Sequence, residues 1–409
     1  MSQTSFPKNK IKVLLLEGIH PGAKALFEKE TFQVELLKQA LEPAELAARM
    51  ADVHILGIRS KTHVTKEVLE AGKRLLTLGC FCIGTNQVDL EAANAHGVPV
   101  FNAPFSNTRS VAELVISEVV ALSRMLGDRS REMHEGKWRK VATNCHEVRG
   151  KTLGIVGYGH IGSQVGVLAE AMGLRVLFYD IATKLPMGNN RPTASLGELL
   201  GESDFVTLHV PATRETHEMI GTAELARMKK GAHLLNLSRG TVVVIPALAE
   251  AIRSGHVAGA AVDVYPHEPS ANSSNEFTSE LRGLPNVILT PHIGGSTEEA
   301  QESIGTEVAT SLIKFTNAGA TNGAVNFPQV EVPQAKGTHR ILNVHRNVPG
   351  VLGAVNRIVS ELGANIRTQV LATDPTVGYL VMDLEQDVSN DVAKAIAALS
   401  TNIRTRILY

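Results

Sequence analysis

The sequence predicts an α/β protein with two doubly wound parallel sheets, followed by a small unit of mixed strands and helices. Three observations support this prediction. Short apolar strands alternate with capped helices through the N-terminal part of the chain, up to residue 104. The same alternation starts again at residue 152. A compact β-α-β-β-α-β pattern occupies the residues after 338.

Length, composition and charge fit a globular protein with several domains. The 409 residues are 44% apolar and 20% charged, and the formal net charge is −1. This balance offers no basic surface for nucleic acid and no polybasic patch for a membrane. The N-terminal segment lacks the apolar core of a signal peptide, so we expect a cytoplasmic location.

The cysteines point to a reducing compartment rather than to a disulfide framework. There are three of them, Cys80, Cys82 and Cys145, and such a low, odd count is typical of cytosolic proteins. Cys80 and Cys82 form a C-x-C pair without the second pair that a zinc site needs. We interpret them as core thiols and predict no metal site.

The first α/β series reads as a complete sheet of the flavodoxin-like kind. Each apolar segment is short enough to be a buried strand, and each is followed by a helical segment or a turn. The predicted strands are residues 12–18, 32–37, 52–58, 74–84 and 98–104, and the predicted helices are residues 21–30, 42–50, 65–72 and 89–97.

A second series interrupts the first. A long amphipathic helix is predicted over residues 110–125, and another over residues 297–319. Between them lie predicted strands at residues 152–157, 175–180, 205–211, 233–240, 259–265 and 286–295, with helices such as 161–173 and 245–255. We therefore expect one discontinuous domain of residues 1–107 and 296–330, with a second domain of residues 108–295 inserted into it.

The segment KTLGIVGYGHIG, residues 151–162, predicts a dinucleotide-binding turn. Gly157, Gly159 and Gly162 have the G-x-G-x-x-G spacing, and they lie between a strand and a helix. Small residues let the backbone approach a pyrophosphate at the helix N-terminus. Asp180 ends the next strand, where a carboxylate accepts hydrogen bonds from a ribose diol and repels a 2′-phosphate. The inserted domain is thus predicted to be a Rossmann domain that binds NAD rather than NADP.

Three polar residues follow other strands of the same predicted sheet. They are Arg239 in NLSRG, Glu268 in DVYPHEP and His292 in LTPHIGG. Ligands of open α/β sheets bind outside the carboxyl ends of the strands, so all three can reach the crevice above the dinucleotide-binding turn, called the fingerprint turn below. Arginine holds a carboxylate and polarises a carbonyl, and histidine exchanges the proton of a hydroxyl. A neighbouring glutamate orients that histidine and raises its pKa.

The C-terminal part of the chain predicts a separate small domain over residues 338–409. Residues 317–337 are rich in Gly, Pro and Asn and are typical of a linker. Strands are predicted at 339–345, 364–373, 377–385 and 403–409, with helices at 349–363 and 392–400. This order is ferredoxin-like, and so small a domain is stabilised by pairing with a second copy.

Several of these segments resemble one family. VGYGHIG with Asp180, NLSRGTVV, AAVDVYPHEP and LTPHIGGST resemble the D-2-hydroxyacid dehydrogenase superfamily, and LGCFCIGTNQVDL and NAPFSNTRSVAELVI are similar to its phosphoglycerate dehydrogenases. The resemblance implies that Arg239 binds substrate, that Glu268 partners the histidine and that His292 is the acid–base residue. It implies NAD contacts at His160, Ile161, Asp180, Val210, Leu237, Ser238, Arg239, Asp263, His292, Ile293, Gly294 and Gly295.

A phosphorylated substrate needs cations or amide donors outside the nucleotide fingerprint. Basic or amide side chains occur in GIRSKT, SNTRS and KWRK. The resemblance selects Arg59, Ser60 and Asn107 as phosphate and carboxylate contacts. It also places Trp138 and Lys140 at a subunit interface, reaching toward a neighbour's site. The alternative for each basic residue is a solvated surface charge.

The C-terminal domain resembles an ACT domain, a module that binds amino acids at subunit interfaces. In serine-inhibited members of the family, residues of the same types as His345, Asn347 and Asn365 hold L-serine. Amide and imidazole groups suit a zwitterion with a hydroxyl, because they offer donors and acceptors without net charge. The alternative is an oligomerisation module without a ligand.

Together these resemblances imply NAD-dependent oxidation of 3-phospho-D-glycerate, the first step of L-serine biosynthesis, with L-serine as feedback inhibitor. They also imply a homotetramer and 2-oxoglutarate as a second substrate. Two alternatives stay open: a dehydrogenase for another 2-hydroxyacid pair such as glyoxylate or hydroxypyruvate, and an NAD-sensing transcriptional corepressor. A corepressor has no evident use for an amino-acid-binding domain.

Overall fold

The computed structural model describes residues 5–269, 277–385 and 388–408. Internal contacts divide the chain into two compact units. One unit, called unit 1 here, contains Met1–Ser106 and Gln301–Tyr409, and the other, unit 2, contains Asn107–Ala300. Among the described residues, no helix combines the length and the apolar character that crossing a bilayer requires.

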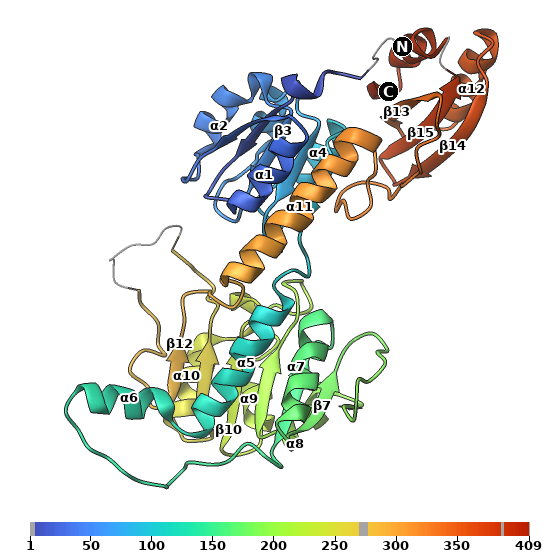
Figure 1. Ribbon diagram of the computed structural model, residues 1–409. Helices are drawn as coiled ribbons and strands as arrows, with labels where there is room; N and C mark the ends of the chain where they lie inside the picture. The colour runs from blue at the N-terminus through green and yellow to red at the C-terminus, as the bar shows by residue number, and fades with distance from the viewer. Residues whose placement is uncertain (1–4, 270–276, 386–387, 409) are drawn as a thin grey trace. The chain divides into compact units, whose positions relative to one another are not determined.

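Unit 1 contains a five-stranded parallel sheet with the order β2-β1-β3-β4-β5. This is the flavodoxin-like order that the sequence predicts. The strands are β1 (Lys12–Leu15), β2 (Gln33–Leu36), β3 (Ile55–Ile58), β4 (Thr77–Cys80) and β5 (Val100–Asn102). The helices between them are α1 (Pro21–Lys29), α2 (Pro43–Arg49), α3 (Lys66–Ala71) and α4 (Leu90–Ala95) (Figure 1).

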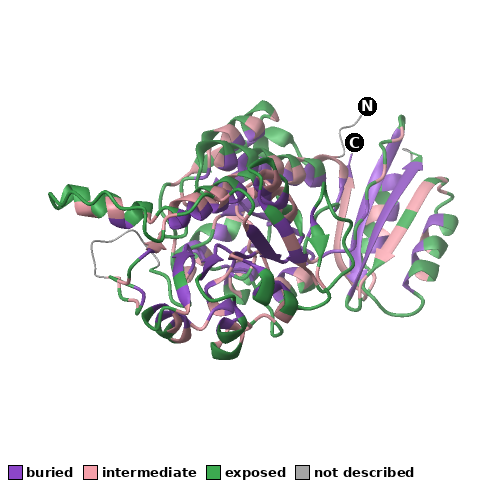
Figure 2. Ribbon diagram, turned by 90° about the horizontal axis from the view of Figure 1, so that it is seen from below, coloured by how far each residue is buried: buried purple, intermediate pink, exposed green. Residues whose placement is uncertain are grey.

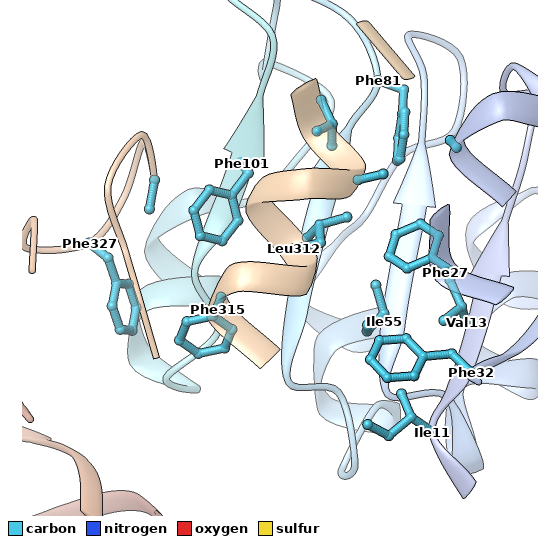
Figure 3. Close-up of a cluster of buried hydrophobic side chains, with 14 of the residues drawn as sticks. Ile11, Val13, Phe27, Phe32, Ile55, Phe81, Phe101, Leu312, Phe315 and Phe327 are labelled. Atoms are coloured by element: carbon cyan, nitrogen blue, oxygen red, sulfur yellow. The ribbon is translucent and has the colours of Figure 1, made fainter. Parts of the chain in front are cut away.

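The long helix α11 (Glu298–Ala318) packs against this sheet. Its residues Val308, Leu312 and Phe315 are buried in the same cluster as Phe27 and Phe101 from the N-terminal segment of unit 1 (Figure 3). The packing is tight enough that a side chain at Gly79 of β4 would meet Val308 and Leu312. Burial of these apolar side chains therefore joins two segments that are far apart in sequence.

Unit 2 contains a seven-stranded parallel sheet with the order β12-β11-β10-β9-β6-β7-β8. The strands are β6 (Thr152–Val156), β7 (Arg175–Tyr179), β8 (Arg191–Pro192), β9 (Phe205–Leu208), β10 (Ala232–Asn236), β11 (Val257–Val262) and β12 (Val287–Leu289). The helices are α5 (Thr108–Ser123), α6 (Leu126–His134), α7 (His160–Ala171), α8 (Leu196–Glu202), α9 (Thr222–Arg227) and α10 (Ile245–Arg253). The central order is that of a Rossmann sheet.

Helix α6 was not predicted from the sequence. The predicted helix over 110–125 ends two residues earlier, because Met125 adopts the left-handed conformation with φ +51°. The chain then turns into α6, which Asp128 holds in place: its buried carboxylate accepts a hydrogen bond from the backbone N–H of Asn286, at 2.7 Å. This partner is distant in sequence, so local patterns cannot reveal it.

The C-terminal domain has the predicted β-α-β-β-α-β order. Its elements are β13 (Thr338–Arg346), α12 (Val351–Glu361), β14 (Ile366–Thr373), β15 (Val377–Glu385), α13 (Ser389–Ala397) and β16 (Asn402–Leu408). They form an antiparallel sheet with the order β14-β15-β13-β16. The central strands β13 and β15 are buried along most of their length, whereas the edge strand β14 is exposed or half-buried throughout (Figure 2).

The predicted linker is packed rather than open over much of its length. Phe327 and Val330 are buried in the core that contains α11. Arg340 of β13, fully buried, forms an ion pair with Asp383 and donates hydrogen bonds to the carbonyl oxygens of Ala318, Val332 and Pro333. Gly and Pro content indicates a turn-rich segment correctly, but it does not reveal these tertiary contacts.

Candidate active site

The candidate residues of unit 2 gather at one edge of its sheet. In a parallel sheet the carboxyl ends of all strands lie on the same edge. Within three residues of the strand ends lie Gly157 after β6, Asp180 after β7, Val210 after β9, Leu237–Arg239 after β10, Asp263 after β11 and His292 after β12. This register brings predicted positions from more than a hundred residues of sequence to a single edge.

The fingerprint turn has the geometry that a dinucleotide needs. Gly157 has φ +91°, and a side chain there would meet the backbone of His209. A side chain at Gly162 would meet the carbonyl of Gly157, so helix and strand approach closely. Gly159, the N-cap of α7, has open space where its Cβ would be. The turn therefore leaves room for a pyrophosphate at the N-terminus of α7.

Asp180 holds the same turn. One carboxylate oxygen accepts a hydrogen bond from the backbone N–H of Tyr158 at 2.8 Å, and the other accepts one from Ala182 at 2.9 Å. The carboxylate keeps free lone pairs for a ribose diol, and its charge disfavours a 2′-phosphate. The fingerprint and Asp180 thus fit NAD.

Glu268 and His292 form a hydrogen-bonded pair. Nδ1 of His292 lies 2.7 Å from Oε2 of Glu268, while Oε1 of Glu268 accepts the backbone N–H of Tyr265 at 3.0 Å. With the Nδ1 proton directed at the carboxylate, the Nε2 atom is the one left for a substrate. His292 has φ +55°, an uncommon conformation for a non-glycine residue, and its backbone N–H donates to the carbonyl of Asp263.

The contact between Glu268 and His292 shifts both pKa values in the direction that acid–base chemistry requires. The hydrogen bond with Glu268 raises the pKa of His292 above its usual value, although partial burial opposes this effect. Partial burial favours a higher pKa for Glu268, but the hydrogen bonds from His292 and Tyr265 outweigh it and lower that pKa. The carboxylate therefore stays ionised while the imidazole changes protonation.

Arg239 lies close enough to act on this pair electrostatically. Its positive charge lowers the pKa of both Glu268 and His292 as a smaller contribution. The guanidinium donates to the carbonyl of Ser238 at 2.7 Å, and the Arg239 carbonyl accepts from Asn236 at 3.0 Å. The next residue is Gly240, and its lack of a side chain is required because a Cβ atom there would meet the backbone of Tyr265. The structure thus brings Arg239, Glu268 and His292 to the same edge.

Asp263 has a structural role that the sequence did not indicate. Its buried carboxylate accepts hydrogen bonds from the Thr290 hydroxyl at 2.6 Å and from the backbone N–H groups of Ile293 and Gly294, both at 2.8 Å. It therefore fixes the loop that carries His292. Buried carboxylates after strands are a recognisable signal for such loop contacts, but only the fold shows which loop is held.

Glu118 of α5 was also missed by sequence reasoning. It is 3% exposed, and neither carboxylate oxygen has a hydrogen-bond partner among the described residues. Burial, together with the nearby charge of Asp263, raises its pKa to about 8. At neutral pH, the Glu118 side chain is therefore a neutral carboxylic acid close to the charge of Asp263.

The remaining predicted NAD residues lie along the same edge of unit 2. His160 and Ile161 begin α7, and Leu237 and Ser238 are buried after β10. Ser238 donates from its hydroxyl to Asn236 at 2.8 Å. Gly294 is buried, and its carbonyl accepts from Ser110 at 2.6 Å, while Gly295 packs against Asn107.

The predicted substrate residues are divided between the two units. Arg59 and Ser60 follow β3 in unit 1. Asn107 is the N-cap residue of α5 in unit 2, and its buried Oδ1 has no partner among the described residues. Lys140 is exposed in the coil after α6, close to Trp138, whose exposure is 81%.

The predicted serine residues lie at opposite ends of the C-terminal sheet. His345 pairs with Gly378, and Asn347 donates to the carbonyl of Asp374 at 2.6 Å, in the turn between β14 and β15. Asn365 donates to Glu385 at 3.2 Å, at the other end of β15. One copy of the domain therefore does not bring all three side chains together.

Comparisons with known proteins agree with this architecture. Residues 116–294 match the model of the D-isomer specific 2-hydroxyacid dehydrogenase NAD binding domain, and residues 341–404 match an ACT domain of the AHAS small subunit-like kind. The D-lactate dehydrogenase of Aquifex aeolicus, solved with NAD and lactic acid, is 25% identical with a TM-score of 0.66, covering 78% of this chain and all of that one.

Proteins of similar length match over nearly the whole sequence. D-3-phosphoglycerate dehydrogenase of Dictyostelium discoideum is 58% identical, over 99% of both chains. D-3-phosphoglycerate dehydrogenase of Escherichia coli K12 is 51% identical over the full length of both. The similarity covers the parallel sheets and the ACT domain together. This chain therefore belongs to the D-3-phosphoglycerate dehydrogenase family of NAD-binding D-isomer-specific 2-hydroxyacid dehydrogenases.

Proposed function

We propose that this protein oxidises 3-phospho-D-glycerate to 3-phosphohydroxypyruvate, the first step of L-serine biosynthesis. The observation that carries the proposal is the Glu268–His292 hydrogen bond of 2.7 Å at the edge where the fingerprint turn lies. Relatives at 50 to 58% identity bear the name of this enzyme. NAD, when bound, supplies the hydride acceptor.

The proposed chemistry separates hydride and proton. The C2 hydrogen leaves as hydride, the hydroxyl proton passes to Nε2 of His292, and the C2–O bond becomes a carbonyl. Glu268 keeps the Nδ1 proton in place and stabilises the imidazolium that forms. Arg239 holds the substrate carboxylate and polarises the C2 oxygen. In the reverse direction, the imidazolium returns the proton.

We assign the substrate phosphate to residues outside the Rossmann sheet. Arg59 and Ser60 lie after β3, at the carboxyl edge of the unit 1 sheet, where ligands of such sheets bind. Asn107, whose side-chain NH2 group can donate to an anionic oxygen, and Lys140 complete the proposed contacts. Accordingly, residues 1–107 and 296–330 form the substrate domain, and residues 108–295 form the inserted NAD domain.

The same cations suit a dicarboxylate. 2-Oxoglutarate has a carboxylate beside its ketone and a second one at the far end of the molecule. Arg239 would hold the first and Arg59 the second. We therefore include reduction of 2-oxoglutarate to 2-hydroxyglutarate in the proposal, as a reaction of the same site.

L-Serine is proposed as the effector of the ACT domain, bound between two copies. β13 and β14 are both antiparallel to β15, so they run parallel to each other. Asn347 follows the end of β13, whereas Asn365 precedes the start of β14. If the exposed edge strands β14 of two copies pair in antiparallel fashion, Asn365 of each copy approaches the His345–Asn347 end of the other.

Subunit contacts of a second kind are proposed for the α6 region. Leu126, Met133, Trp138 and Val141 are all exposed apolar side chains within or just after α6. Such a patch is typical of a protein–protein interface. Contacts through this region and through the ACT domain would give the proposed homotetramer, which we place in the cytoplasm.

A substrate panel tests the function. Purified protein is assayed for NADH oxidation with phosphohydroxypyruvate, hydroxypyruvate, glyoxylate and 2-oxoglutarate. The proposal predicts the highest kcat/KM with phosphohydroxypyruvate. Preference for hydroxypyruvate or glyoxylate would leave the dehydrogenase chemistry intact but contradict the phosphate assignment. Absence of turnover with all four would favour a role in NAD sensing.

A further inference from the structure

We propose that Glu17 is a positioning residue that shapes the loop of residues 59–62 and thereby sets the preference for a phosphorylated substrate. The inference rests on the proposed function, in which Arg59 and Ser60 contact the phosphate. Glu17 acts through this loop and is not itself a contact of the substrate.

Glu17 and the loop lie at the carboxyl ends of neighbouring strands. Glu17 comes two residues after β1, and Arg59 comes directly after β3. β1 and β3 pair in parallel, and the hydrogen bond from Leu16 N–H to the Gly57 carbonyl, 2.9 Å, continues this pairing beyond β1. The two segments therefore leave the sheet side by side.

The Glu17 carboxylate binds three of the four backbone N–H groups of the loop. Oε1 accepts from Arg59 at 3.0 Å and from Thr62 at 2.9 Å, and Oε2 accepts from Lys61 at 3.0 Å. Hydrogen bonds to an ionised carboxylate are about twice as strong as neutral ones. One side chain thus folds the loop around itself.

The remaining N–H group, that of Ser60, is left unused. It makes no hydrogen bond to any described part of the chain, and Ser60 is exposed. The loop therefore offers an N–H group, the Ser60 hydroxyl and the Arg59 guanidinium at adjacent positions. These three donors suit the oxygens of a phosphate monoester.

Gln87 fixes the carbonyl group of the same residue, Arg59. It is 4% exposed, and its side-chain amide donates to the carbonyl of Arg59 at 2.6 Å and to that of Gly84 at 3.3 Å. The backbone of Arg59 is thus fixed at its N–H by Glu17 and at its carbonyl by Gln87. The Arg59 guanidinium also lies beside Glu17, since it donates to the Glu17 backbone carbonyl at 3.5 Å.

The conformation of Glu17 itself is costly. Its φ is +62°, in the left-handed region that disfavours side chains by about 1 kcal/mol or more. Its N–H donates to the Gln39 carbonyl at 3.1 Å, which holds the turn in this conformation. Strained non-glycine residues of this kind cluster at functional sites, where their surroundings maintain them.

The test compares kinetic constants of full-length Glu17→Gln with those of the wild type. The amide of the substituted side chain presents donors where one N–H needs an acceptor, so the loop loses its fixed shape. We expect KM for phosphohydroxypyruvate to rise roughly 10-fold or more, as for a lost charge-assisted contact. KM for NADH, kcat, and kcat/KM for unphosphorylated hydroxypyruvate should each stay within about twofold.

The matched control is Asp204→Asn. The Asp204 carboxylate accepts the Thr152 N–H at 2.9 Å and forms an ion pair with Lys229, at the amino ends of β6 and β9 in unit 2, the edge of that sheet opposite to the candidate site. This variant should lower thermal stability without changing the ratio of kcat/KM for the two substrates. Equal effects of both substitutions on that ratio would overturn the proposal.

Two further variants separate the possible failures. Gln87→Met should reproduce the substrate-specific rise in KM, and it serves as an independent test if Glu17→Gln does not fold. Arg59→Ala should also lose the phosphate preference, and adding Glu17→Gln to it should change little more. If Arg59→Ala alters the preference and neither Glu17→Gln nor Gln87→Met does, the role of Glu17 is refuted. If Arg59→Ala leaves the preference intact, the phosphate assignment falls, and this inference with it.

Discussion

The Rossmann sheet of unit 2 and the antiparallel ACT sheet both carry polar residues at strand ends, but only the first assembles them within one chain. In the parallel sheet, residues after β10, β11 and β12 share an edge, and Glu268 and His292 are hydrogen-bonded. In the ACT sheet, Asn347 follows one strand and Asn365 precedes another that runs in the same direction. The proposed catalytic pair is therefore preformed, whereas the proposed serine residues would need a second copy to come together.

The largest expected effect concerns the Glu268–His292 pair of unit 2. His292→Asn removes the group proposed to take the C2 hydroxyl proton. General acid–base catalysis contributes typically about 10²–10⁴-fold, so kcat should fall by a factor in that range. Steady-state kinetics in both directions measure it, with NAD affinity from fluorescence titration as the control. A fall of less than about tenfold would place the acid–base group elsewhere.

The second effect concerns the buried carboxyl behind the catalytic edge. Since the pKa of Glu118 is raised to about 8, the folded protein holds a proton that the unfolded chain loses above its ordinary pKa. Wild-type stability should therefore decline from this source as pH rises toward 8, by roughly 2 kcal/mol between pH 6 and 7.5.

Glu118→Gln removes that contribution, because the amide does not titrate. Denaturant unfolding at several pH values measures the difference between the two proteins. The variant should gain stability relative to the wild type as pH rises. A difference independent of pH would mean that Glu118 is ionised and hydrated in the folded protein.

The third effect concerns the proposed serine residues of the ACT domain. Asn347→Ala and Asn365→Ala should each weaken serine inhibition by roughly 10-fold or more, since each removes a hydrogen bond to a charged ligand. Turnover without serine should stay unchanged. A mixed pair of the two variants contains one site with both asparagines intact and one with neither.

In an equimolar mixture refolded together, about half of the pairs are mixed and one of the two sites in each mixed pair is intact, so isothermal titration should count about a quarter of the wild-type number of high-affinity serine sites. Recovery of none would show that both asparagines serve a site within one chain, or that they do not bind serine. The pure variants, denatured and refolded separately by the same protocol, are the control.

Much of this architecture could be predicted from the sequence, because its signals are local. Apolar strand segments, the glycine spacing at 157–162 and Asp180 mark the Rossmann sheet and its ligand edge without any long-range information. The strand ends carrying Arg239 and His292 follow from the same pattern. The observed sheet topology and the match to an NAD-binding domain confirm the predicted fold class and NAD as cofactor.

What could not be predicted depends on contacts between distant residues. The packed segment before β13 relies on Arg340, which forms an ion pair with Asp383 of β15 and donates to the Val332 carbonyl within the segment. The carboxylates of Asp263 and Glu17 bind backbone N–H groups, which every residue except proline has, so the sequence cannot show which loop each carboxylate binds. Helix α6 depends on a hydrogen bond between Asp128 and Asn286.

The most direct test of the central claim is the pH dependence of phosphohydroxypyruvate reduction by the wild type and by Glu268→Gln. Reduction needs the imidazolium of His292, so kcat/KM should fall as pH rises through its raised pKa. Without the Glu268 carboxylate that pKa drops, and the midpoint of the fall should move to lower pH. An unchanged midpoint would contradict the assignment of this pair as the acid–base machinery.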